Sequence, residues 1–215
     1  NGNSFVKGLG AAPAVRLTSS NYQNLSPDPV SQLSSLQISV QNHSYGTGIE
    51  NYYGIEAAEY DQQVYITDTI THVFSSGNSG TTTSTTGVYA GIANLANLTG
   101  TFKQAKNVLV VGGTNNDNLA EARSSAGPAY DGRIKPELVA AGEDGTSGAA
   151  ALTSGVVSLL QQQYKIKTGV LPSSALIRSI LINSSDDLGN AAPDFKYGFG
   201  KLNAYSAIQT IVENR

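Results

Sequence analysis

The sequence predicts an α/β fold in which helices cover a mostly parallel β-sheet. Short runs of apolar and β-branched residues alternate with longer segments of helical periodicity. This alternation is typical of parallel strands that are joined by crossover helices. The chain has 215 residues, and no repeat or charge block divides it. That length is sufficient for one domain with its own core, so we expect residues 1–215 to belong to a single α/β domain.

Five short runs, most of which end in Gly, Ser or Asn, are predicted to be strands. They comprise residues 14–18, 36–41, 70–74, 107–112 and 137–140. Helices are expected to begin near Tyr53, at Thr146, at Pro172 and at Leu202. Pro172 suits a first helical turn, because its missing N–H would have no partner there. These helices should cover the faces of the sheet.

The composition excludes several classes of function. A net charge of −3 with scattered Lys and Arg does not provide the basic surface that nucleic acid requires. No apolar run approaches the ~20 residues that span a bilayer, and the first residues show no signal-peptide pattern. There is no cysteine for a disulfide or a thiolate metal site. We therefore expect neither a nucleic acid nor a membrane as partner. The absence of methionine suggests an internal or processed fragment.

The segment Gly-Thr-Ser-Gly-Ala at residues 145–149 carries the main candidate for chemistry. Ser147 lies at the start of an apolar helix, where backbone N–H groups have no helical partner and negative charge is favoured. A nucleophilic serine gains an oxyanion donor from its own N–H at such a place. Small neighbours let a substrate carbonyl approach. The alternative is that Thr146 or Ser147 is simply the N-cap of the helix.

Two other segments follow predicted strands, at the sheet edge where α/β folds bind ligands. Asn78, in Ser-Gly-Asn-Ser-Gly at residues 76–80, could donate its side-chain amide to an oxyanion. The alternative is an ordinary turn, in which Asn is common. Residues 42–46, Asn-His-Ser-Tyr-Gly, could pair with an extended peptide.

The sequence contains two histidines, and both lie in or beside predicted strands. His43 could serve as the general base for a serine. For His43, a packed or hydrogen-bonded role in the sheet is the favoured interpretation. Burial is favoured more strongly for His72, which lies in the middle of a predicted strand. Asp131 and Arg133 are expected to pin the loop that precedes a strand.

Six segments in order along the chain resemble motifs of the subtilisin-like serine peptidases, the subtilase family. They cover residues 10–204, so the resemblance extends over nearly the whole chain. They are GAAPA at 10–14, NHSYG at 42–46, SGNSG at 76–80, GPAYDGRIKPE at 127–137, GTSGA at 145–149 and YGFGKLNA at 197–204.

The resemblance implies a three-layer α/β/α sandwich and a secreted serine endopeptidase that acts on polypeptides through an acyl-enzyme. It implies that Ser147 is the nucleophile and that Asn78 and the N–H of Ser147 form the oxyanion hole. It also implies a substrate cleft with Ser44, Tyr45 and Gly46 on one wall and with Ser75, Ser76 and Gly77 on the facing wall of the S1 pocket.

In this family the triad Asp and His precede the segment that resembles residues 10–14, and neither of their motifs occurs here. We therefore expect this chain to be the C-terminal portion of the domain. The Asp and His would lie upstream of residue 1, on an N-terminal fragment of the same precursor if the protein is processed. The chain alone should then be inactive.

The alternative is a catalytically inactive, subtilase-derived binding or structural domain. An α/β-hydrolase would need a serine in G-x-S-x-G, which Ser147 does not have. No cofactor is expected for the chemistry. Relatives often bind structural calcium, but no calcium-ligand pattern or other metal motif occurs here.

Overall fold

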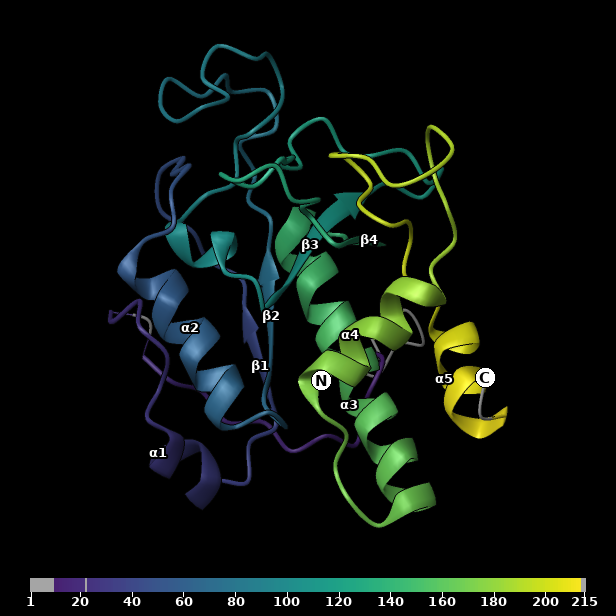
Figure 1. Ribbon diagram of the computed structural model, residues 1–215. Helices are drawn as coiled ribbons and strands as arrows, with labels where there is room; N and C mark the ends of the chain where they lie inside the picture. Colours follow the sequence, from purple (N-terminus) through teal and green to yellow (C-terminus); the bar gives the residue numbers. More distant parts are fainter. Residues whose placement is uncertain (1–9, 22, 214–215) are drawn as a thin grey trace.

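The centre of the molecule is a four-stranded parallel sheet (Figure 1). The computed structural model describes residues 10–21 and 23–213. The strands are β1 (Val40–His43), β2 (Thr71–Ser75), β3 (Leu109–Thr114) and β4 (Leu138–Ala141), and they lie side by side in that order. All three pairs are parallel, so the carboxyl ends of the strands share one edge.

Helices cover both faces of this sheet. The described residues contain α1 (Val30–Ser35), α2 (Ile55–Ile66), the 3-10 helix η2 (Thr101–Gln104), α3 (Gly145–Thr168), α4 (Ser174–Asn183) and α5 (Ala204–Glu213). α4 begins where Ser173 accepts the N–H of Leu176, at 3.2 Å. None of these helices is long and apolar enough to cross a bilayer.

Two cores form because neighbouring side chains of a strand point to opposite faces of the sheet. On β2, Val73 belongs to the core beneath α3, α4 and α5, whereas Phe74 belongs to the core beneath α2 and η2. Val110 of β3 lies on the same side as Phe74. The three-layer α/β/α arrangement predicted from the sequence is therefore confirmed, with α2 on one side and α3 to α5 on the other (Figure 1).

Two of the predicted strands differ from the structure. Residues 14–18 form no strand, because they pair with no neighbouring strand in the described part of the chain and their side chains are exposed. The strand predicted at residues 36–41 begins only at Val40, since Leu36 caps α1 and Gln37 has a φ of +56°. The other three strands lie within two residues of the predicted positions.

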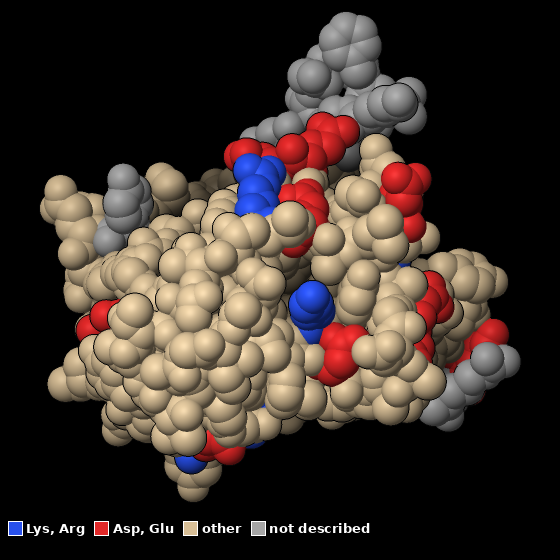
Figure 2. Space-filling model, turned by 90° about the horizontal axis from the view of Figure 1, so that it is seen from above, with Lys and Arg blue, Asp and Glu red and all other residues tan. Residues whose placement is uncertain are grey.

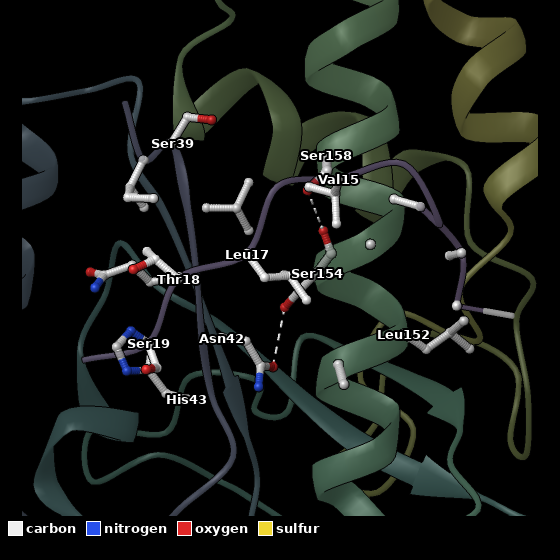
Figure 3. A pocket seen from close by; sticks show the side chains of 18 of the residues that line it. Val15, Leu17, Thr18, Ser19, Ser39, Asn42, His43, Leu152, Ser154 and Ser158 are labelled. Carbon is white, nitrogen blue, oxygen red and sulfur yellow. Dashed lines mark hydrogen bonds between the residues drawn. The ribbon is translucent and has the colours of Figure 1, made fainter. Parts of the chain in front are cut away.

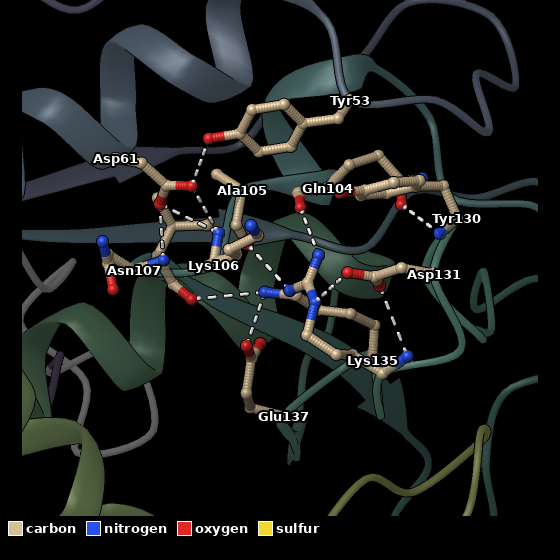
Figure 4. A network of polar contacts seen from close by, with 12 residues as sticks. Tyr53, Asp61, Gln104, Ala105, Lys106, Asn107, Tyr130, Asp131, Lys135 and Glu137 are labelled. Carbon is tan, nitrogen blue, oxygen red and sulfur yellow. Dashed lines mark hydrogen bonds and ion pairs between the residues drawn. The ribbon is translucent and has the colours of Figure 1, made fainter.

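A polar network holds the loops before β4 against η2 and β3 (Figure 4). Arg133 donates to Asp131 at 2.8 Å and to the carbonyl of Gln104 at 2.7 Å, which agrees with the predicted pinning of this loop. Deeper in the network, the Nζ of Lys135 lies 2.5 Å from a carboxylate oxygen of Glu137. Glu137 also accepts the N–H of Val110 at 2.7 Å. This buried ion pair therefore connects the loop to the central strand β3.

Replacement of Glu137 by Ala is expected to destabilise the fold by about 3–5 kcal/mol, because it leaves the buried charge of Lys135 unpaired. The free energy of unfolding in urea measures the effect. Asp131→Ala is the matched control: its ion pair is partly exposed, so the cost should stay below about 1 kcal/mol. Equal losses of unfolding free energy in the two variants would contradict the assignment of Glu137 as the partner that neutralises the buried Lys135.

Candidate active site

Segments that follow three strands enclose a cavity of about 260 Å³ at the carboxyl edge of the sheet. It brings together residues that lie 100 positions apart in the sequence. Seven of the eight site residues predicted from the sequence line it, namely Ser44, Tyr45, Gly46, Ser75, Gly77, Asn78 and Ser147. The view from this edge shows few charged side chains, of both signs, and no basic stripe on the face shown (Figure 2).

Ser147 is the third residue of α3 and is partly exposed. Its N–H lies in the first turn of the helix, where backbone donors have no i−4 carbonyl and the helix dipole favours negative charge. The N-cap of α3 is Asp144. The structure thus contradicts the alternative in which Thr146 or Ser147 is the cap.

Asn78 lies in the turn after β2, and its side chain reaches the start of α3. Its Oδ1 accepts hydrogen bonds from the backbone N–H of Thr146 at 3.3 Å and from the hydroxyl of Thr146 at 3.0 Å. A backbone N–H can only donate, so the atom that faces it must be the carboxamide oxygen. The Nδ2 group of Asn78 is consequently directed away from Thr146 and is available as a donor.

Thr146 positions this arrangement, a role that the sequence did not reveal. Its buried hydroxyl donates to Asn78 and accepts the N–H of Gly77 at 3.3 Å. Gly145 allows the close approach: it has a φ of +62°, and a Cβ there would lie 2.9 Å from Oδ1 of Asn78. The only signal was the place of Thr146 between Gly145 and Ser147 in one motif.

The two predicted walls of the cleft converge on the hydroxyl of Thr99. A Cβ on Gly46 would lie 2.4 Å from Oγ1 of Thr99, and a Cβ on Gly77 would lie 2.3 Å from the same atom. Lys103 donates from Nζ to this hydroxyl at 2.7 Å. Thr99 and Lys103 therefore form a floor between the walls. They were not predicted, because neither the loop that contains Thr99 nor the short 3-10 helix that contains Lys103 carries a recognisable motif.

The wall that carries Ser44 is fixed to α3. The hydroxyl of Ser44 donates to the backbone carbonyl of Ser147 at 3.0 Å and accepts from Asn42 at 2.9 Å. Ser76 is the predicted lining residue that does not line the cavity. It is fully buried, and in extended backbone its side chain points to the opposite face from that of Ser75.

Both histidines belong to the core beneath α2 rather than to the small cavity. The Nε2 of His43 lies 3.0 Å from Nδ1 of His72, whose Nε2 lies 2.9 Å from Oε1 of Gln63. The ring of His43 stacks on Phe74 at 4.2 Å, and its Nδ1 lies 3.1 Å from the hydroxyl of Tyr45. The packed interpretation of both histidines agrees with this geometry, and neither lies beside Ser147 in the described part of the chain.

No group of three or more His, Cys, Asp or Glu side chains that could hold a metal ion occurs among residues 10–21 and 23–213.

The chain belongs to the subtilase family, since the model of that family matches residues 10–200. Its fold is similar to the patellamide maturation protease PatA, with a TM-score of 0.65 and 20% identity. That match covers 85% of this chain and 66% of PatA. The prenylagaramide maturation protease PagA gives a TM-score of 0.64 with 21% identity, over 84% of this chain and 64% of PagA. The chain thus spans slightly under two thirds of these structures.

Stability should fall as the pH is lowered below about 6.5. Burial lowers the pKa of His72 to about 3, and burial together with His72 lowers the pKa of His43 well below 6.5. The unfolded state, with ordinary histidine pKa values near 6.5, then binds more protons than the folded state at lower pH. The stabilisation is complete above that pH and is lost as the pH falls toward the folded pKa. The low pKa of His72 alone should lower the free energy of unfolding by about 2 kcal/mol between pH 6.5 and 5.0.

Urea unfolding of the wild type and of His72→Gln over this pH interval tests the prediction. In the variant, the free energy of unfolding should decrease less steeply as the pH is lowered. Equal slopes would show that His72 does not set the pH dependence.

Proposed function

We propose that this chain supplies the nucleophile and the oxyanion hole of a serine endopeptidase. The observation that carries the proposal is the fixed orientation of Asn78: with Oδ1 bound by Thr146, its Nδ2 is free to donate, and Asn78 and Ser147 line the same cavity. This Nδ2 and the N–H of Ser147 would supply the two donors that a tetrahedral intermediate requires.

In the proposed reaction, Oγ of Ser147 attacks the peptide carbonyl carbon while a base accepts the hydroxyl proton. The negative oxygen that forms is stabilised by the two donors. The base then gives the proton to the leaving amine, the C–N bond breaks, and an acyl-serine remains. Water activated by the same base hydrolyses this ester and restores Ser147.

An extended polypeptide is the proposed substrate. It would lie between the wall of Ser44 and Gly46 and the wall of Ser75 and Gly77, with one side chain in the cavity between them. PatA and PagA are described as maturation proteases. Those structures share about a fifth of their residues with this chain, so the substrate proposal depends on the cleft and not on that likeness.

The base and the Asp that orients it are proposed to come from a segment that precedes residue 1 in the natural protein. A groove of about 1380 Å³ between β1 and α3 supports this assignment. It is lined by Asn42 and Ser154, and it extends to Gly148, directly after the nucleophile. In Figure 3, Val15 and Leu17 cross this groove without filling it. β1 is an edge strand in the sheet of the described residues, so an added segment could also pack beside it.

A second candidate is a subtilase-derived binding or structural domain without catalysis. The observation that favours it is that no histidine in the described ranges accompanies Ser147. We further propose that the chemistry needs no cofactor and that the protein acts outside the cell.

Ser147→Ala in the complete natural protein is expected to abolish both peptide hydrolysis and labelling by a fluorophosphonate. Asn78→Ala should lower kcat about 10²- to 10³-fold, the range found for one such donor in subtilisin, because one oxyanion donor is lost. Ser179→Ala, at an exposed serine of α4 that lines neither the cavity nor the groove, is the control and should retain activity. Hydrolysis that persists in Ser147→Ala would exclude the acyl-enzyme. A natural protein that is not labelled would favour the non-catalytic domain.

The isolated chain of residues 1–215 should not be labelled, whereas addition of the natural upstream segment should restore labelling of Ser147. The physical reason is that a serine hydroxyl reacts slowly until a base removes its proton. Labelling of the isolated chain at the rate of the natural protein would show that the base lies within these 215 residues.

A further inference from the structure

The floor of the small cavity contains a buried amine without a carboxylate partner. Lys103 is fully buried, and within residues 10–21 and 23–213 its Nζ has one hydrogen bond, to Oγ1 of Thr99 at 2.7 Å. No carboxylate of the described residues forms an ion pair with it. Lys135, the other fully buried lysine of this part of the chain, is paired with Glu137 at 2.5 Å. The fold therefore neutralises one buried lysine and leaves the other without a counter-charge.

An unpaired buried cation is costly, because the lost hydration is not replaced by a partner of opposite charge. Burial lowers the pKa of Lys103 to about 7. A carboxylate that arrived beside Nζ would stabilise the protonated amine and would form a charge-assisted hydrogen bond. The site is thus suited to an anion supplied from outside.

The position of Lys103 makes that anion a side chain of the substrate. Its Nζ lies 3.1 Å from the place where a Cβ of Gly46 would be, and Gly77 closes on Thr99 from the opposite wall. Both glycines let the walls approach Thr99 closely, so that Thr99 and Lys103 close the end of the cavity between the walls. A side chain of the bound peptide that enters the cavity would end near Thr99 and Lys103, both of which line the cavity with Ser147.

We propose that Lys103, assisted by Thr99, selects an acidic side chain, Asp or Glu, on the residue that precedes the scissile bond. This inference rests on the proposed peptidase function and adds the specificity of the same site. The substrate carboxylate would accept hydrogen bonds from Nζ of Lys103 and from the hydroxyl of Thr99. The centroid of the Phe102 ring lies 5.7 Å from Nζ of Lys103.

Matched peptides with Glu, Gln, Asp, Asn or Phe before the scissile bond test the proposal in the complete natural protein. The wild type should cleave the Glu peptide about 10- to 100-fold better than the Gln peptide in kcat/KM, the difference that a hydrogen bond to a charged group provides. Lys103→Met, which keeps a long unbranched side chain, should reduce the ratio of Glu to Gln cleavage to about 1. Lys106→Met, at an exposed lysine three residues away, should leave the ratio unchanged.

Thr99→Val provides a second variant in case Lys103→Met does not fold. It keeps the shape of the side chain and should lower the same ratio, because the hydroxyl that orients Nζ is lost. A ratio near 1 in the wild type, or an unchanged ratio in a folded Lys103→Met protein, would overturn the proposal.

Fluorophosphonate labelling distinguishes failure of the specificity proposal from failure of the peptidase proposal. It reports the reactivity of Ser147 and does not depend on the substrate side chain before the scissile bond. Rapid labelling with better cleavage of the Phe peptide would reject the specificity and keep the peptidase. Absence of labelling in the wild type would reject both. Loss of labelling in a folded Lys103→Met protein would show that the amine serves Ser147 as a base, which also overturns the specificity role.

Discussion

The candidate site depends on the hydrogen bonds of Thr146. Its hydroxyl and its N–H hold the oxygen of Asn78, and the hydroxyl also accepts the N–H of Gly77. One residue of α3 thereby fixes the turn after β2 relative to the helix that carries Ser147. Without it, the amide of Asn78 could rotate, and the two donors would no longer be oriented before the reaction. Such orientation in advance is what makes an oxyanion hole effective.

The fold supplies this contact through simple geometry. Because all four strands are parallel, the turn after β2, the segment after β1 and the start of α3 after β4 meet at one edge. Glycine then permits the distances that the site needs. At Gly46, Gly77 and Gly145 a Cβ would lie under 3 Å from a neighbouring side chain, closer than carbon atoms approach in folded proteins. The walls, the floor and the helix start can converge only because these positions carry no side chain.

Much of this arrangement could be predicted from the sequence, for reasons that differ from residue to residue. The strands β2, β3 and β4 were predictable because continuous apolar runs must be buried on both faces. Residues 14–18 also contain apolar residues, but such a run cannot show by itself whether a neighbouring strand exists to pair with. Ser147 and Asn78 were found through local motifs. Thr99 and Lys103 were not, because their importance arises only from contacts with Gly46 and Gly77.

The two halves of a serine peptidase mechanism are physically separable here. The described residues form the walls, the floor and the two proposed oxyanion donors, whereas the proposed proton transfer requires a base that they do not place beside Ser147. Substrate binding and oxyanion stabilisation each act without the base, and in serine peptidases they retain a small part of the catalysis when triad members are removed. A segment that enters the groove between β1 and α3 would therefore complete a cleft that is already shaped. The specificity of the enzyme would then be set by residues of this chain, and its activation by the segment that joins it.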